Sequence, residues 1–404
     1  MNRRRVATVI TRMTAGAGGV ALRGALALDP DRYAVTIITG GTGLSGQRVE
    51  STDEVVTGID AVKDAPVGDL LAEAYAAGFD VVRVPALVPQ LAPRRDAAAL
   101  RTLAALYATG RYDIVHTHSA KAGALGRIAA ARAGVPWIVH TYHGFPFHAF
   151  QPRWRRTAYV AIERRLSRRT DAFLAVGSGV AAEAIRRRLA PPDRIRTIAP
   201  AVDPIENPGC TARRGLGRHR LGLPAGVRLV GTVGRVDYQK APDVWIDALA
   251  AVGGDDVWGV WIGDGPLRER LLARARRRHV ADRFCLLGHR DDVADLLPAL
   301  DVFALASRYE GLPCALVEAM GAGVPVVATT VNAVPDVVVA GETGLLVPPE
   351  DAGLLGRAVR YLLDEPAEAQ RMATAARDNI GDRYAPHALG AVLDQVYGGR
   401  RSWT

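Results

Sequence analysis

The sequence of 404 residues is poor in cysteine, in aromatic residues and in lysine. Its three cysteines, Cys210, Cys285 and Cys314, are odd in number and far apart along the chain. They form neither a C-x-x-C pair nor a disulfide framework. We therefore expect a protein of the reducing cytoplasm.

Long apolar runs are also missing. No run approaches the ~18 residues that a membrane-spanning helix needs, and the five apolar residues after Arg3–Arg5 are fewer than the roughly 7 of a secretory signal. Hydrophobic residues make up 49% and charged residues 23% of the chain. This balance excludes a disordered or collagen-like protein, and the length suggests two or three domains at roughly 150 residues each.

Positive charge is concentrated in the first half. Residues 1–205 hold 28 Lys and Arg against 17 Asp and Glu, a net charge of +11, whereas residues 206–404 hold 23 against 25, a net charge of −2. The first half is therefore expected to face an anionic partner, such as a membrane leaflet, a phosphorylated acceptor or nucleic acid. The alternative is that arginine is simply abundant throughout this sequence.

Segment 151–169 carries seven of these arginines and is predicted to be a helix. Trp154, Ala158, Tyr159, Ile162 and Leu166 fall in rough helical register within it. Basic amphipathic helices of this kind can lie on anionic membranes. A helix packed on the core with a solvated arginine face explains the pattern equally well.

Short apolar runs alternate with longer helical patterns along the whole chain. Continuous apolar runs are typical of strands covered on both faces, as in parallel sheets, and their alternation with helices predicts repeated βαβ units. We expect strands at 6–10, 34–39, 80–84, 113–116, 137–141, 172–176, 229–233, 258–262, 284–287, 302–305, 325–328 and 345–347. The fold class is therefore α/β, with two doubly wound domains joined by the Gly-, Pro- and Arg-rich segment 205–226. In such sheets ligands bind at the carboxyl ends of the strands.

Two loops of the first half could carry chemistry. Gly16, Gly18 and Gly19 follow the first strand, and a Gly-rich turn before a helix can hold phosphate on backbone N–H groups. NAD binding is disfavoured because the second strand ends in Thr39-Gly40-Gly41, without the acidic residue that grips the ribose. A close approach to another ligand, or a plain tight turn, remains open.

Histidines cluster between residues 116 and 148. Alternation along a strand places His116 and His118 on one face, and His143 follows the next strand immediately before Gly144. A metal site is conceivable, but no nearby Asp, Glu or Cys completes a ligand set. His143 is the best candidate to point into a ligand-binding cleft.

The second half offers a site for a diphosphate. After the strand that ends at Val233, Gly234 leaves room for a ligand, and Arg235 and Lys240 follow within six residues. A planar guanidinium and a point-charge ammonium suit a diphosphate. A solvated basic loop is the alternative. Gly263 and the Gly288-His289-Arg290 turn follow two further strands, and the latter could lie against a nucleobase.

Two glutamates accompany a predicted helix that starts at Pro313 and runs to about Ala322. Glu310 lies in the loop before it and Glu318 inside it, about 7.5 Å farther along the axis. Because a helix N-terminus favours anions, the carboxylates would sit beside an anion site, one holding a transferred group and the other a ribose. Their different depths argue against an acid–base pair acting on one bond.

Together these motifs resemble the GT-B glycosyltransferases of family 4, a large retaining family. The resemblance rests on Gly231, Gly234, Arg235 and Lys240, on GDGPL at 263–267, on the glutamate pair, on Val334-Pro335-Asp336 and on GETGLLVPPED at 341–351. In the first half HTHSAKAGALGR and HTYHGFPFH are similar to enzymes that build capsule, exopolysaccharide or lipid-linked glycans. Asn332 departs from the pattern, which often has Gly there, but Asn tolerates a left-handed backbone.

The resemblance implies a fold and a role for each candidate. Two Rossmann-like domains would face each other across a cleft: an acceptor domain at 1–204 and a nucleotide-sugar domain at 227–385, with a helix in 386–404 crossing back to the first. Arg235 and Lys240 would neutralise the donor diphosphate, with Glu318 on the ribose. The donor sugar would meet Glu310 and the segment Gly311, Leu312 and Pro313. Gly234, Gly263, His289 and Arg290 would complete the nucleotide site. His143 would lie near the reacting carbon, and the 16–19 loop and His118 would lie on the acceptor side.

The resemblance further implies front-face substitution with retention, and no metal or other cofactor, because Arg, Lys and a helix N-terminus supply the positive charge. We expect a hexosyltransferase that uses a nucleotide sugar, most simply a UDP-sugar, on a lipid-linked or small-molecule acceptor in polysaccharide or lipid-linked glycan synthesis. It would be cytoplasmic or peripheral on the inner face of the membrane. Alternatives are a secondary-metabolite glycosyltransferase, a nucleotide-sugar epimerase or hydrolase, and a non-enzymatic nucleic-acid-binding protein. The last is disfavoured because aromatic residues amount to only 6% of the chain.

Overall fold

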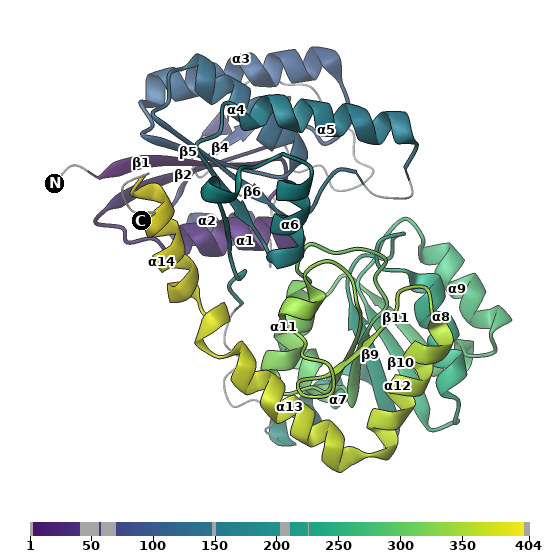
Figure 1. The fold of residues 1–404 in the computed structure, drawn as a ribbon. Helices are drawn as coiled ribbons and strands as arrows, with labels where there is room; N and C mark the ends of the chain where they lie inside the picture. Colours follow the sequence, from purple (N-terminus) through teal and green to yellow (C-terminus); the bar gives the residue numbers. More distant parts are fainter. Residues whose placement is uncertain are drawn as a thin grey trace. The chain divides into compact units, whose positions relative to one another are not determined.

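The computed structural model describes residues 3–40, 56–57, 70–147, 151–202, 211–224 and 226–399. The chain forms two compact units, each with its own parallel sheet (Figure 1). The first comprises Met1–Ala201 together with Pro386–Thr404, and the second comprises Val202–Ala385. Among the described helices, none is long and apolar enough to cross a bilayer.

The sheet of the first unit has the strand order β3-β4-β2-β1-β5-β6-β7-β8. All neighbours are parallel except β3 and β4, which are antiparallel. Strand order reverses between β1 and β5, so the loops after these two strands meet at the carboxyl edge. The strands are β1 (Arg4–Ile10), β2 (Tyr33–Gly40), β3 (Val56–Thr57), β4 (Asp80–Val84), β5 (Ile114–His118), β6 (Trp137–Tyr142), β7 (Ala172–Ala175) and β8 (Ile195–Thr197).

Helices cover both faces of this sheet, with α3, α4 and α5 on one side and α1 and α2 on the other (Figure 1). The last helix, α14, packs against α1. A Cβ on Gly390 of α14 would come within 2.3 Å of the Ala27 carbonyl oxygen, so the two backbones lie in close contact. The helices are α1 (Ala15–Leu26), α2 (Leu70–Ala76), α3 (Pro93–Gly110), α4 (Ala120–Arg132), α5 (Arg153–Ser167), α6 (Ser178–Arg186) and α14 (Pro386–Tyr397).

The second unit has a fully parallel sheet in the order β11-β10-β9-β12-β13-β14, with its reversal between β9 and β12. Its strands are β9 (Arg228–Val233), β10 (Val257–Ile262), β11 (Phe284–Gly288), β12 (Val302–Leu305), β13 (Val326–Thr329) and β14 (Leu345–Val347). Its helices are α7 (Thr211–Leu221), α8 (Pro242–Val252), α9 (Arg268–Arg277), α10 (Val293–Leu296), α11 (Cys314–Gly321), α12 (Ala352–Asp364) and α13 (Pro366–Ile380).

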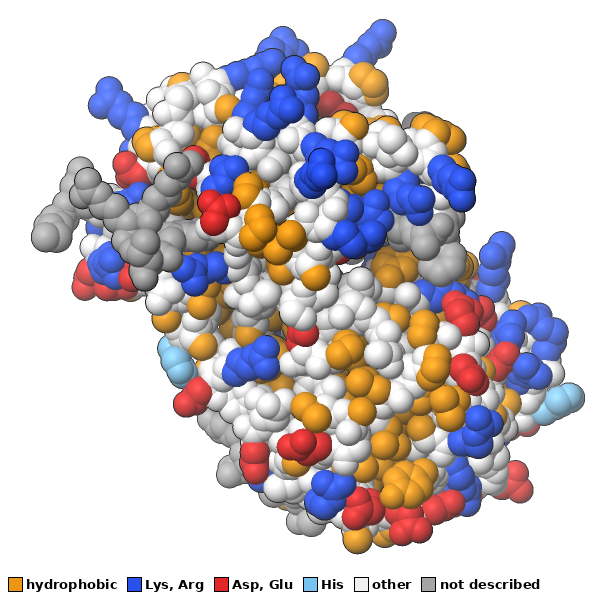
Figure 2. Space-filling model, in the orientation of Figure 1, with side chains coloured by type: hydrophobic (Ala, Val, Ile, Leu, Met, Phe, Trp, Pro, Cys, Tyr) orange, Lys and Arg blue, Asp and Glu red, His pale blue; other side chains and the backbone are white. Residues whose placement is uncertain are grey.

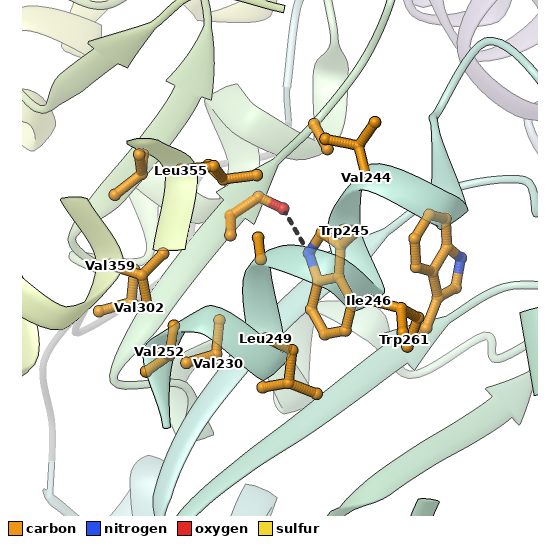
Figure 3. Close-up of a cluster of buried hydrophobic side chains, with 14 of the residues drawn as sticks. Val230, Val244, Trp245, Ile246, Leu249, Val252, Trp261, Val302, Leu355 and Val359 are labelled. Carbon is orange, nitrogen blue, oxygen red and sulfur yellow. Dashed lines mark hydrogen bonds between the residues drawn. The ribbon is translucent and has the colours of Figure 1, made fainter. Parts of the chain in front are cut away.

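Two tryptophans anchor the core of the second unit (Figure 3). The rings of Trp245 and Trp261 pack edge to face with their centroids 5.7 Å apart. Each indole N–H has a partner, since Nε1 of Trp245 donates to the Ala304 carbonyl oxygen at 3.0 Å and Nε1 of Trp261 donates to that of Gly234 at 2.8 Å. The second of these bonds ties the core directly to the turn that follows β9.

The structure confirms the expected α/β class, with two doubly wound parallel-sheet domains, and strands occur at all twelve expected positions. β3 and β8 were not expected. The expected connection 205–226 contains helix α7, which packs on α10 in the second unit, whereas residues 205–210 and 225 lie outside the described residues. Gly215 and Gly217 have a low intrinsic helix propensity, so the sequence did not predict a helix there. Packing of α7 against α10 compensates for this low propensity.

Candidate functional site

The loops after β9 and β12 lie side by side where the strand order of the second unit reverses. The backbone N–H of Arg308 donates to the Gln239 carbonyl oxygen at 2.8 Å, which joins the loop before α8 to the loop before α11. Ligands of doubly wound folds bind at this place, outside the carboxyl ends of the strands. The residues of these two loops therefore form the candidate site.

Lys240 and Glu310 meet there as an ion pair. Nζ of Lys240 donates to Oε1 of Glu310 at 2.6 Å, and the two side chains are only 16% and 5% exposed. Removing either partner of such a shielded pair would leave a buried charge without compensation, which is strongly destabilising. Both residues are candidates from the sequence analysis, and the structure places their side chains in direct contact.

Two further donors hold the carboxylate of Glu310. Oγ of Ser307 donates to Oε1 at 2.6 Å, and Nε2 of Gln239 donates to Oε2 at 3.0 Å. Since a carboxylate has about four lone-pair directions, Oε2 keeps room for one more donor. Lys240 likewise retains N–H donors beyond the one it gives to Glu310. Glu310 can therefore accept a hydrogen bond from a hydroxyl while Lys240 donates one to an anion.

The backbone of Glu310 is fixed by Asn332. Its N–H donates to Oδ1 of Asn332 at 2.9 Å, and Asn332 has a left-handed φ of 44°. The expectation that Asn could adopt the conformation usually supplied by Gly is confirmed. Asn adds a hydrogen bond that Gly could not make. Just beyond it, Val334–Asp336 form a short 3-10 helix.

Glycines allow the loops after β9 and β10 to approach closely. A Cβ on Gly263 would come within 2.2 Å of the Gly234 carbonyl oxygen, so only glycine fits there. A Cβ on Gly234 would meet Cε of Lys240 at 3.0 Å. The absence of a side chain at Gly234 therefore leaves space for the Lys240 side chain to reach Glu310.

Arg235 is the exposed member of the cluster, with 67% of its side chain accessible. Its guanidinium pairs with the carboxylate of Asp237 two residues on. Asp237 also accepts from the backbone N–H of Lys240 at 3.2 Å, so it organises the turn between the two cations. Sequence reasoning had missed this role.

Helix α11 begins at Cys314, and Pro313 occupies the N-cap position rather than the first helical position that we expected. Its ψ of 100° is extended, which explains the one-residue difference. Leu312 and Pro313 are buried, Gly311 and Glu318 are partly buried, and Glu318 lies in the middle of α11. The backbone N–H groups of Leu316 and Val317 donate to the Pro313 carbonyl oxygen at 3.0 and 3.4 Å, so the first turn of α11 is closed on the loop that follows Glu310.

His289 and Arg290 follow β11 and make contacts within their own loop. Arg290 donates to both carboxylate oxygens of Asp292, at 2.7 and 2.6 Å. The side chain of His289 is 83% exposed, 3.6 Å from Asp291. The structure thus places both at the carboxyl edge of the same sheet, outside the Lys240–Glu310 cluster.

In the first unit the side chains of His116, His118 and His140 are buried, that of His143 is partly buried, and each of the four makes a hydrogen bond. His116 contacts the Tyr397 hydroxyl through Nδ1 at 2.8 Å and the Thr141 hydroxyl through Nε2 at 2.7 Å. Nδ1 of His118 lies 2.9 Å from Nε2 of His143, so one ring donates to the other. The rings of His116 and His118 are 4.2 Å apart, as expected for one face of a strand.

Burial keeps these rings neutral. It lowers the pKa of His116 to about 3 and that of His143 to about 4, because a charged imidazolium would lose its hydration. The pKa values of His118 and His140 are lowered well below the usual range for the same reason. Within the described ranges no group of three or more His, Cys, Asp or Glu side chains is arranged to hold a metal ion.

The expected glycine loop at 16–19 is instead the start of a helix. Gly16, Gly18 and Gly19 belong to α1, which begins at Ala15, and the β1–α1 connection is confined to residues 11–14. Gly18 lies so close to Met13 and Leu70 that a Cβ would come within 3.0 Å of both. Tight packing therefore accounts for this glycine, and its place in a helix corrects our expectation.

Comparison with known families shows to which family the chain belongs. The model for "Glycosyl transferases group 1" matches residues 217–379, and the model for "Glycosyltransferase Family 4" matches residues 15–206. This chain is a family 4 glycosyltransferase with the GT-B fold. The resemblance stated from the motifs is thereby confirmed, and the expectation of an enzyme of the glycosyltransferase class is confirmed with it.

Two curated relatives differ in what their names say they glycosylate. The UDP-Gal:alpha-D-GlcNAc-diphosphoundecaprenol alpha-1,3-galactosyltransferase of Escherichia coli is 32% identical over 275 residues, which cover 67% of this chain and 70% of the relative. The 2-deoxystreptamine glucosyltransferase of Streptomyces kanamyceticus is 31% identical over 66% of this chain and 72% of its own length.

Among solved structures, HepE of Anabaena in complex with UDP and glucose superposes with a TM-score of 0.78. The match covers 98% of this glycosyltransferase and all of HepE, at 18% identity. A likeness at this identity establishes the fold, and it agrees with the two parallel sheets described above.

Proposed function

We propose that this glycosyltransferase moves a hexose from a UDP-sugar to an acceptor hydroxyl with retention of anomeric configuration. The observation that carries the proposal is the buried Lys240–Glu310 pair at the switch point of the second sheet. It offers a cation for a phosphate and a carboxylate for a sugar hydroxyl. The UDP and glucose named in the HepE complex support this donor class.

Charge develops on the leaving diphosphate as the anomeric C–O bond breaks. Lys240 and Arg235 would stabilise this charge, together with the first-turn N–H groups of α11. The acceptor oxygen attacks the anomeric carbon from the side on which the diphosphate leaves, and the acceptor proton passes to the departing phosphate oxygen. This route needs no dedicated side-chain base and no metal ion.

The remaining residues would bind the donor. Oε2 of Glu310 would accept a hydrogen bond from a hydroxyl of the sugar, and the backbone of residues 311–313 would lie beside the sugar (Gly311, Leu312 and Pro313). Glu318 would bind the ribose. The loops with Gly263, His289 and Arg290 would border the nucleotide, and Arg290 would have to share its guanidinium with Asp292. His143 and His118 of the first unit would face the acceptor side, where the 16–19 segment would contribute the N-terminus of α1.

The acceptor that we favour is lipid-linked. The E. coli relative is named for a diphosphoundecaprenol acceptor, and the first half of this chain carries a net charge of +11. An anionic acceptor at the cytoplasmic face of the membrane fits both observations. The second candidate is a small secondary-metabolite acceptor, which the name of the S. kanamyceticus relative favours.

A panel of UDP-sugars and other nucleotide sugars, assayed for nucleotide diphosphate release, tests the proposal. Each donor is tried with a polyprenyl-diphosphate glycan, with 2-deoxystreptamine and without acceptor. We expect release that depends on the lipid-linked acceptor, and NMR of the product should show the anomeric configuration of the donor. Release without acceptor would indicate a hydrolase, and an inverted product would overturn the proposed mechanism.

A further inference from the structure

Helix α5 has one face turned into the core of the first unit, formed by Val160, Glu163, Leu166 and Ser167. The carboxylate of Glu163 accepts from the guanidinium of Arg127 at 2.8 Å, with the two side chains 5% and 0% exposed. The Tyr142 hydroxyl donates to the same carboxylate at 3.4 Å. This face is fully accounted for by packing.

The opposite face of α5 exposes large apolar side chains. Trp154 is 74% and Ile162 is 52% exposed, with exposed Ala158 between them at the same helical spacing. Such spacing places the three on one stripe. The apolar residues expected in one helical register therefore fall on two faces of α5. Leu166 packs inward, whereas Trp154 and Ile162 face outward.

Arginines border this stripe. Residues 151–170 contain a single acidic residue, Glu163, and its carboxylate is buried and paired with Arg127. Arg155 and Arg165 on α5 are exposed, and so is Arg169 in the turn that follows the helix. Helical spacing places Arg165 beside Trp154 and Arg155 beside Ile162. The face of the first unit that carries α5 shows a gathering of Lys and Arg side chains (Figure 2). The exposed face of α5 is therefore both apolar and strongly positive.

We propose that this face of α5 lies on an anionic lipid bilayer, with Trp154 and Ile162 in the boundary between headgroups and acyl chains and the arginines on lipid phosphates. Tryptophan favours this boundary, and helices with an apolar stripe flanked by arginine lie in its plane. A nucleic-acid partner would call for a series of exposed aromatic side chains, whereas the stripe pairs one tryptophan with aliphatic residues. Membrane binding is independent of the transfer reaction proposed above.

Flotation of the full-length protein with vesicles tests the proposal. One set of vesicles is pure phosphatidylcholine and the other contains equal amounts of phosphatidylcholine and phosphatidylglycerol. Because each arginine near an anionic surface contributes roughly fivefold to binding, we expect the triple variant R155Q/R165Q/R169Q to lose more than tenfold of its binding to anionic vesicles. W154S/I162S should lose a similar amount.

The matched control is R270Q/R276Q/R277Q on α9, which removes the same charge from exposed arginines of the second unit. It should bind like the unchanged protein, and all three variants should keep their melting temperature because the altered side chains are exposed. On addition of anionic vesicles, a blue shift in tryptophan fluorescence should occur in the unchanged protein and be absent from W154F.

Equal loss of binding in the α9 control would overturn the proposal, because net charge alone would then explain the binding. Binding to anionic and neutral vesicles alike would do the same. Tight binding of single-stranded RNA through α5 without any fluorescence shift on vesicles would instead assign this face to nucleic acid.

Discussion

The side chain of Asn332 holds the backbone of Glu310, whose N–H lies 2.9 Å from Oδ1. Glu310 in turn holds Lys240, so the loop after β13 supports the ion pair formed by the loops after β9 and β12. The side chains of Asn332 and Glu310 together thus connect three βα loops of the second sheet at its carboxyl edge.

Replacing Asn332 with Gly separates its two roles. Gly keeps the left-handed φ of 44° without strain but loses the hydrogen bond to Glu310. We expect a loss of about 1 kcal/mol in the free energy of unfolding and a several-fold fall in kcat. Urea denaturation and initial rates of UDP release measure the two effects. Unchanged kcat in N332G would mean that the bond does not position Glu310.

Lys240→Ala should abolish turnover, because losing one preorganised charge-stabilising donor costs about 3–4 kcal/mol in the barrier. It should also lower stability by about 1–3 kcal/mol, since Glu310 is left buried without its cation. The double variant K240A/E310Q should recover stability but not activity. Near-normal rates in K240A would refute the assignment of the site.

Glu318→Ala should strongly reduce turnover at donor concentrations below KM while leaving the fold intact. Glu318 is only partly buried on α11, and hydrogen bonds to a charged group contribute about 1.5–3 kcal/mol, or roughly 10- to 100-fold in kcat/KM. We expect most of the effect in KM for the UDP-sugar. Isothermal titration with UDP checks it directly, and unchanged UDP affinity would remove Glu318 from the ribose site.

Stability should fall as the pH is lowered from about 6.5 toward 4. Folding lowers the pKa of His116 to about 3 and that of His143 to about 4, so in this window the unfolded chain binds protons that the folded chain does not. Each buried histidine should contribute at least about 1 kcal/mol to the loss. Unfolding free energies from urea titrations should therefore rise with pH and level off above 6.5. His140→Gln should flatten the curve, and an unchanged slope in that variant would contradict the assignment.

The contact between α14 and the first unit should be essential for stability. Gly390→Ala places a methyl group 2.3 Å from the Ala27 carbonyl oxygen and should cost about 1–3 kcal/mol. Tyr397→Phe removes the bond to His116 and should cost about 1 kcal/mol. Gly215→Ala in α7, where a Cβ meets nothing within 4 Å, is the control and should be neutral or stabilising. Equal melting temperatures for G390A and the control would contradict the close contact between the backbones of α14 and α1.

Strands such as β1 and β9 were predictable because most of their residues are buried, and they therefore appear as continuous apolar runs. β8 escaped prediction because its three residues, Ile195–Thr197, are too short and polar to form such a run. The start of α1 was misplaced because glycines are typical of turns, whereas Gly16, Gly18 and Gly19 lie inside the helix. At Gly18 the close approach of Met13 and Leu70 leaves no room for a larger side chain.

For the site, the motifs identified Lys240 and Glu310, but the sequence could not show that they touch. Ser307 and Gln239 also escaped prediction, since each acts on Glu310 from a loop position that carries no local signal. Such partners become visible only when two loops distant in sequence are brought to one sheet edge. Asn332 did leave a signal, as a departure from the usual glycine.

The return of the chain to the first unit has a consequence for folding during synthesis. Tyr397 covers His116, and α14 packs on α1 almost four hundred residues after β1 has left the ribosome. During synthesis α14 therefore cannot cover His116 and α1 until the whole second unit has been translated. During that interval the emerging chain is the form most exposed to aggregation and to chaperones.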